Sequence, residues 1–117
     1  MYEYRATVER VVDGDTYDLD IDLGLRVHTL TRVRLYGVDT PETYGVKAGS
    51  AQWKRGQAAK AFVEAWFARH GPLFIVRTFR DRTGKFGRWL VELEDLEREL
   101  RLSQQLLAAG HAVAVGG

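Results

Sequence analysis

Two short segments of the sequence supply hard oxygen ligands. The first is Asp13-Gly14-Asp15-Thr16, and the second is Asp39-Thr40-Pro41-Glu42. Carboxylate and backbone carbonyl oxygens suit Ca²⁺, which accepts several oxygens in a flexible shell. Histidine and cysteine are absent from both segments, so the pattern disfavours zinc. We expect Asp15, Asp39 and the carbonyl oxygen of Thr40 to bind a calcium ion.

Two arginines accompany these segments at positions where an anion could bind. Arg34 precedes the second acidic segment, and Arg88 ends the basic stretch Gly84-Lys85-Phe86-Gly87-Arg88. A guanidinium group holds phosphate oxygens through paired hydrogen bonds. Phosphodiester hydrolysis needs a cation, fixed positive donors and a group that orients or deprotonates water. Glu42, left outside the expected cation shell, could perform the last task.

Taken singly, these segments are weak signals. Asp-Gly is usually a tight turn, Asp-Thr-Pro-Glu a turn or helix cap, and Gly-Lys-Phe-Gly a hairpin loop. An arginine on an alternating strand is usually solvated. Their order and placement in one short chain favour a common site over independent coincidences.

The elements that must position these groups follow from hydrophobic periodicity. Residues 2–12, 16–23 and 26–36 alternate as half-buried strands joined by short turns, which predicts an antiparallel meander. Residues 43–56 are expected to form an exposed loop that contains Trp53, either as an anchor or as a base-stacking residue. Residues 57–70 predict an amphipathic helix that ends at Gly71 and Pro72.

The C-terminal half predicts the remaining strands. Residues 73–79 and 88–93 are expected to form a hairpin across a turn at 80–87, and residues 100–109 to form a short helix. Trp66 and Trp89 are expected in the core. Five strands with a helix between the third and fourth predict an α+β, five-stranded OB-fold barrel within a single domain, residues 1–117.

The chain resembles the staphylococcal-nuclease family along nearly its whole length. The resemblance rests on VDGDT, on VRL followed by VDTPE, and on GKFGR, in this order, with LLAAGHAVA near the end. It implies Ca²⁺ ligation by Asp15, Asp39 and Thr40 and phosphate binding by Arg34 and Arg88. It also implies general-base action by Glu42 and nucleotide contact by Lys85 and Phe86. Members of this family cleave DNA and RNA and leave 3′-phosphate ends.

The chain departs from the family pattern at its C-terminal end. Longer members continue with a nucleotide-stacking tyrosine, where this chain has Gly116, and with a further helix. We expect a homo-oligomer or a partner chain to supply such a helix. Phe86 stands where members often have tyrosine, which keeps a stacking face without the hydroxyl.

Bulk composition sets wider bounds on the protein. The sequence has 117 residues, no cysteine and a net charge of +1, which excludes a disulfide scaffold and gives no strong nucleic-acid signal. No apolar run has the length of a membrane span, and no signal peptide begins the chain, so we expect a cytoplasmic protein or a trimmed secreted domain. A nucleic-acid-binding module without catalysis and a purely structural interaction domain remain alternatives to the nuclease.

Overall fold

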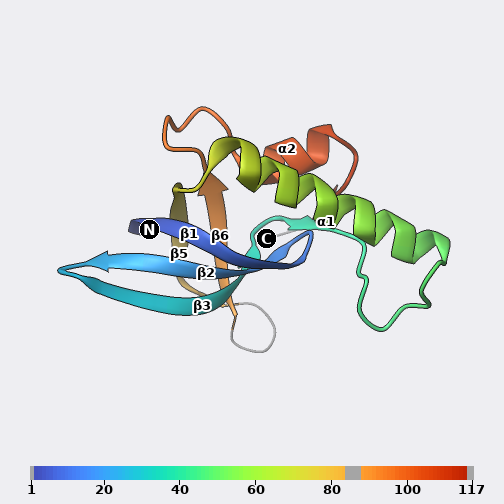
Figure 1. Ribbon diagram of the computed structural model, residues 1–117, viewed down its shortest axis with the longest axis horizontal. Coiled ribbons are helices and arrows are strands. Elements are labelled where there is room, and N and C mark those ends of the chain that lie inside the picture. The colour runs from blue at the N-terminus through green and yellow to red at the C-terminus, as the bar shows by residue number, and fades with distance from the viewer. Residues whose placement is uncertain (1, 84–87, 116–117) are drawn as a thin grey trace.

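The structure, a computed structural model, describes residues 2–83 and 88–115, apart from the side chains of residues 80–83 (Figure 1). Its elements in chain order are β1 (Tyr2–Asp13), β2 (Thr16–Gly24), β3 (Val27–Leu35), β4 (Val38–Asp39), α1 (Ala51–His70), β5 (Phe74–Thr83), β6 (Trp89–Glu94), α2 (Leu102–Ala108) and β7 (Val113–Ala114). No helix within these ranges is both long and apolar enough to cross a bilayer.

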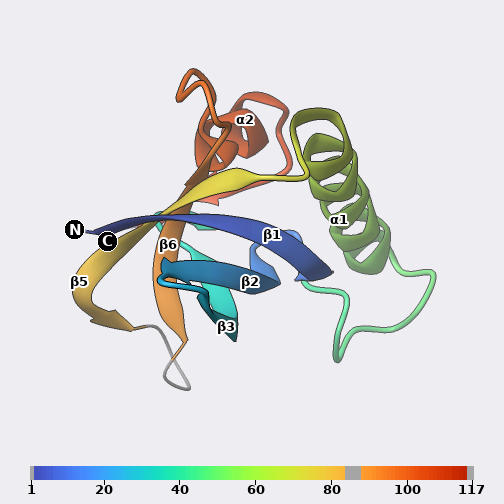
Figure 2. The same cartoon turned by 60° about the vertical axis from the view of Figure 1, so that its left-hand side comes forward.

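Five strands form a closed barrel in the order β1-β2-β3-β6-β5. Strands β1, β2 and β3 form the expected antiparallel meander, and β5 and β6 the expected hairpin. The barrel closes where β3 and β6 run parallel, with Val33–Leu35 opposite Trp89–Val91. Helix α1 lies against β1 on one side of the barrel, and α2 lies beside β6 (Figures 1 and 2). The expected α+β, five-stranded OB-fold is confirmed.

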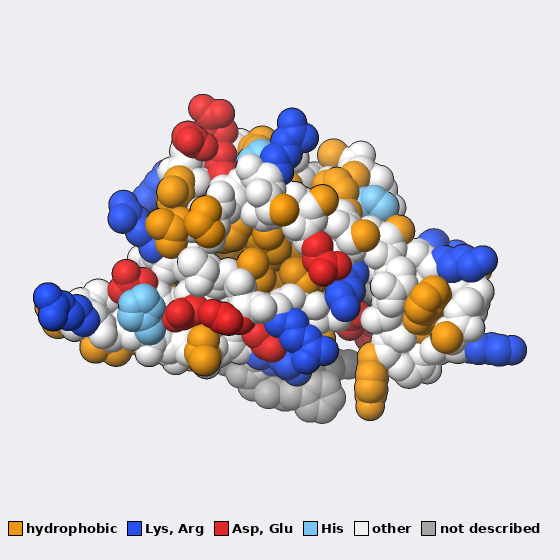
Figure 3. All heavy atoms as spheres, in the orientation of Figure 1, with side chains coloured by type: hydrophobic (Ala, Val, Ile, Leu, Met, Phe, Trp, Pro, Cys, Tyr) orange, Lys and Arg blue, Asp and Glu red, His pale blue; other side chains and the backbone are white. Residues whose placement is uncertain are grey.

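The alternation predicted for β2 determines which of its faces is buried. Tyr17, Leu19 and Ile21 lie in the core. The aspartates between them face outward, where Asp18 accepts two hydrogen bonds from Arg32 and Asp20 contacts His28 on β3. Figure 3 shows acidic, basic and histidine side chains in a mixed row across the lower front of the molecule. A period of two therefore separates core from solvent, as expected for a half-buried strand.

The predicted start of the helix is wrong by six residues. Helix α1 begins at Ala51, where the hydroxyl of Ser50 accepts a hydrogen bond from the backbone N–H of Trp53 at 3.2 Å. Trp53 therefore lies on the helix, in a half-buried position, and not in a loop. The C-terminal end at Gly71 was predicted correctly, and its N–H donates to the carbonyl of Phe67.

Other differences lie at element ends. β5 continues to Thr83, so the first residues of the predicted 80–87 turn are strand, and residues 84–87 lie outside the described part of the chain. Trp66 is in the core as expected, whereas Trp89, the first residue of β6, is 43% exposed, so its expected core position is wrong. The short antiparallel pair β4–β7 was not predicted.

Candidate functional site

Asp15 is a buried carboxylate at the corner between β1 and β2. Its Oδ1 accepts a hydrogen bond from the hydroxyl of Thr16 at 3.0 Å, and its Oδ2 accepts one from the backbone N–H of Thr40 at 3.1 Å. Its backbone carbonyl also accepts from the N–H of Leu35 at 2.8 Å. These bonds join the first predicted segment to the second, although they lie far apart in the sequence.

Tyr17 supports the same corner from inside the barrel. Its side chain is fully buried, and its hydroxyl donates a hydrogen bond to the carbonyl of Gly14. Burial first, and then the nearby charge of Asp15, raises the pKa of Tyr17. The hydroxyl therefore remains protonated and keeps donating at physiological pH.

Arg34 links the two predicted cation ligands. One guanidinium nitrogen of Arg34 lies 3.2 Å from Oδ2 of Asp15 and 2.9 Å from Oδ1 of Asp39. The other donates to the backbone carbonyls of Leu35 and Val38 at 3.3 and 3.2 Å. The guanidinium group is thereby fixed in one orientation, with most of its surface covered.

Two glycines allow the second segment to approach the rest of the molecule closely. A Cβ atom at position 14 would lie 2.8 Å from Oγ1 of Thr40 and 3.0 Å from Cβ of Ala59. A Cβ atom at position 56 on α1 would lie 2.8 Å from the carbonyl oxygen of Glu42. The 40–42 segment is therefore seated on both the β1–β2 corner and α1, which fixes its carbonyl groups in place.

The C-terminal strand holds the same segment from the other side. Val113 on β7 pairs with Asp39 on β4, and the N–H of Val115 donates to the carbonyl of Gly37 at 3.0 Å. Asp39 itself is exposed at the surface, with 53% of its side chain accessible. Its position is thus set by backbone pairing as well as by Arg34.

Arg88 connects to this site through a hydroxyl. Its guanidinium nitrogen lies 3.4 Å from Oγ1 of Thr16, which in turn donates to Asp15. Arg34 and Arg88 therefore approach the same aspartate from two neighbouring strands. Glu42 is exposed and shares a cleft of about 1000 Å³ with Thr16 and Arg88.

Apart from Asp13 and Trp53, the cleft also contains residues that the sequence did not single out. Charged, neutral polar and aromatic side chains from β1, β3, the 42–44 segment and α1 line it. They are Arg10, Arg32, Lys60, Asp13, Thr43, Tyr44, Trp53 and Gln57. Asp13 and Thr16 belong to the Asp-Gly-Asp-Thr motif and could have been found from it. Nothing in the sequence marks Arg10 or Lys60, because only the packing of α1 on β1 brings them together. Lys85 and Phe86 lie outside the described residues.

A divalent cation fits the oxygen groups gathered here. Asp15 and Asp39 converge on one guanidinium nitrogen of Arg34, and the backbone N–H of Thr40 contacts Asp15. Within the described residues, no three acidic, histidine or cysteine side chains gather as a metal site. The two carboxylates that meet here are oxygen donors of the kind that a hard divalent cation prefers.

The comparison with known proteins agrees with this picture. No family model matches the chain. The chain is 39% identical over 105 residues to the thermonuclease of Staphylococcus intermedius, an alignment that covers 86% of this chain and 56% of that protein. The chain thus spans about half the length of this curated relative. The sequence similarity and the closed five-stranded barrel confirm the resemblance of this chain to the staphylococcal-nuclease (thermonuclease) family.

Proposed function

We propose that the protein is a calcium-dependent nuclease that hydrolyses phosphodiester bonds of DNA or RNA and leaves 3′-phosphate ends. The convergence of Asp15 and Asp39 on Arg34, beside the cleft that holds Glu42 and Arg88, carries this proposal. The name of its relative, thermonuclease, supports a nuclease function.

Each group in the proposed site has one task. Asp15, Asp39 and the carbonyl of Thr40 would hold Ca²⁺, which supplies positive charge to the phosphoryl oxygens when bound. Arg34 and Arg88 hold two phosphoryl oxygens and stabilise the charge that grows there in the transition state. Hydrogen bonds to the carbonyls of Leu35 and Val38 orient Arg34, and Thr16 contacts Arg88.

We assign the proton of the attacking water to Glu42. Its carboxylate is exposed in the cleft and makes no hydrogen bond or ion pair with the described side chains, so it is accessible to water. We assign it the removal of a proton from a water molecule that attacks phosphorus. The bond from phosphorus to the 5′ oxygen of the next nucleotide breaks, and that oxygen leaves as a hydroxyl after protonation.

A plasmid-nicking assay with Ca²⁺ or with EDTA tests the proposal. We expect nicking only with the cation, and a loss of about 100-fold or more for Glu42→Ala and for Arg88→Ala. Glu99→Ala and Arg69→Ala, which remove the same charges from exposed positions elsewhere, serve as matched controls. Fragments that require phosphatase treatment before 3′ extension by a polymerase would identify the 3′-phosphate product. Wild-type rates in folded Glu42→Ala and Arg88→Ala would remove the mechanism.

Binding without cleavage is the second candidate, because two of the cleft's cations have no ion-pair partner among the described residues. Arg10 and Lys60 form no salt bridge there. A protein that holds labelled oligonucleotide but cuts none with Ca²⁺, Mg²⁺ or Mn²⁺ would favour this function over the nuclease.

A further inference from the structure

We propose that Arg10 and Lys60 form a second phosphate-binding subsite, which takes the phosphate next to the one that is cleaved. This inference rests on the proposed nuclease function for its substrate, but not for its geometry. The substrate would be a nucleic-acid strand with at least two phosphates. Arg10 and Lys60, which lie outside the recognised motifs, would bind one of them.

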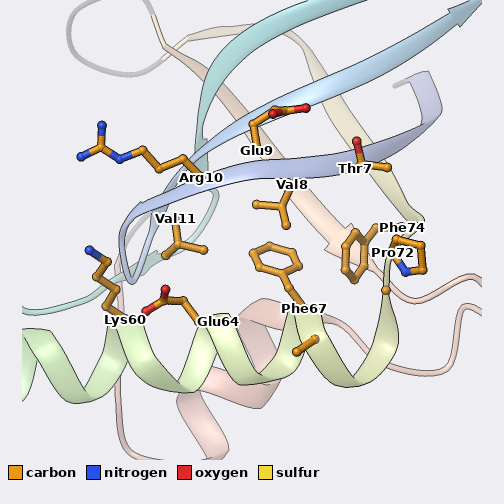
Figure 4. A pocket seen from close by; sticks show the side chains of 12 residues that line it. Thr7, Val8, Glu9, Arg10, Val11, Lys60, Glu64, Phe67, Pro72 and Phe74 are labelled. Atoms are coloured by element: carbon orange, nitrogen blue, oxygen red, sulfur yellow. The ribbon is translucent and has the colours of Figure 1, made fainter.

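The first argument is position. Arg10 lies on β1 and Lys60 on α1, and both line the cleft that contains Arg88 and Glu42. Figure 4 shows the two side chains extending toward the same side of the molecule, away from Pro72 and Phe74. Residues from two different elements therefore place their positive ends at one end of the cleft.

The second argument is charge balance. Arg32, another cation of the cleft, is paired with Asp18 at 2.7 and 3.1 Å, and this bond first, then the charges of Arg32 and Arg10, lower the pKa of Asp18. Asp13 keeps its negative charge, since its hydrogen bond at 2.8 Å comes from the neutral hydroxyl of Thr43. Arg10 and Lys60, in contrast, have no ion-pair partner within the described ranges. Unpaired cations in a cleft attract an anion, and a phosphodiester group is the anion that adjoins a cleaved phosphate.

The third argument concerns where along the cleft the subsite ends. Beyond Arg10 and Lys60, the cleft continues into a groove of about 690 Å³ between β1 and α1. Figure 3 shows charged side chains around apolar ones on this side of the molecule, and the groove is lined by Glu9 and Glu64. Two carboxylates repel a phosphate, so the favourable contact ends at Arg10 and Lys60.

Aromatic side chains lie where the intervening nucleotide would pass. Trp53 precedes Lys60 by seven residues on α1, and Gln57 lies between them, so these residues share one face of the helix. All three line the cleft, together with Tyr44, which is 88% exposed. A base between the two phosphates would find an aromatic face beside it.

The experiment compares Arg10→Gln/Lys60→Gln with Arg5→Gln/Arg69→Gln. The control removes the same charge from the same strand and the same helix, at exposed positions that do not line the cleft. The substrates are a dinucleoside monophosphate, which has one phosphate, and a trinucleoside diphosphate, which has two. We expect kcat/KM to rise with the second phosphate in wild type and in the control, and this gain to fall about 10-fold in the cleft variant.

Salt dependence gives an independent readout. The slope of log affinity against log salt for a fluorescein-labelled oligothymidylate should decrease in magnitude by about 0.7 in the cleft variant, for one lost phosphate contact. Equal gains and equal slopes for the two double variants would overturn the subsite. Because this binding assay needs no cleavage, a wild type that cuts nothing would end the proposed function, while a changed slope would still support the subsite.

Discussion

The backbone N–H of Thr40 donates a hydrogen bond to the carboxylate of Asp15 at 3.1 Å, across 25 residues of sequence. This bond joins the corner between β1 and β2 to the segment after β4. Asp15 is 7% exposed and Thr40 4% exposed, so the bond is protected from water. Asp15, which we assign to the cation, therefore also stabilises the fold. Asp39, in contrast, is exposed and makes no such buried bond with Thr40.

Replacement of the two aspartates should separate stability from activity. Asp15→Ala leaves the buried N–H of Thr40 without its acceptor and should lower the free energy of unfolding by about 2 kcal/mol. Asp39→Ala removes an exposed carboxylate and should cost less than about 1 kcal/mol. Both should abolish calcium-dependent cleavage. Urea unfolding beside a nicking assay measures the difference, and equal stability losses would contradict it.

Gly14→Ala should destabilise the corner through a steric clash. The added Cβ would lie 2.8 Å from Oγ1 of Thr40, and an overpacked contact of this kind costs about 1–3 kcal/mol. The Thr40 hydroxyl is buried and has no hydrogen-bond partner among the described residues, so Thr40→Ala should keep its activity. The double variant removes the contact with Oγ1 but keeps those with the Cβ atoms of residue 40 and Ala59 at 3.0 Å, so the clash is relieved only in part. Thermal unfolding should still show a smaller loss than the sum of the single changes.

Glu92 on β6 should make stability depend on pH. Its side chain is 8% exposed, Oε1 accepts from the hydroxyl of Ser103, and Oε2 has no partner in the described part of the chain. Burial raises the pKa of Glu92 above its ordinary value of 4.5, although the bond from Ser103 lowers it. The unfolded chain therefore ionises first, and the native state loses stability as pH rises from 4.5 through the higher folded pKa.

The test compares wild type with Glu92→Gln, which cannot ionise. The stability of wild type relative to this variant should decline as pH rises above 4.5 and be constant at lower pH. Other titrating groups cancel in the difference, which urea unfolding at each pH supplies. A difference that does not change with pH would contradict the prediction.

The pairing of β7 with β4 should matter for cleavage more than for stability. Val115→Pro removes the N–H that donates to Gly37, so β4 and Asp39 lose a support at the molecular surface. We expect activity to fall about 10-fold, with a change in unfolding free energy near 1 kcal/mol. Val115→Ala keeps the N–H and is the control. Equal activity in the two variants would show that the pairing does not position Asp39.

Local periodicity accounts for most of the fold that could be predicted. The alternation around Tyr17 and Leu19 determined a strand and its buried face, and Gly71 ended the helix as expected. The start of α1 was missed because Gly56 and the charged residues near it are typical of a loop. In the structure the missing side chain of Gly56 allows Glu42 to approach, a reason that only tertiary packing provides.

The candidate site divides in the same way. Asp15, Arg34, Asp39 and Arg88 lie in motifs with recognisable order, and contacts join them directly or through Thr16. Arg10, Lys60 and the cleft position of Trp53 lie outside any motif. Their proximity arises from the way α1 packs on β1, and local sequence carries no signal for that contact.

The strand pair that closes the barrel, β3 with β6, also aligns Arg34 and Arg88. Arg34 lies in the three-residue parallel contact between β3 and β6, and Arg88 immediately precedes it. A short seam of this kind opens more readily than the long ladder of β1 and β2, since few hydrogen bonds hold it. On warming, Arg34 and Arg88 should therefore lose their alignment while most of the barrel is still folded.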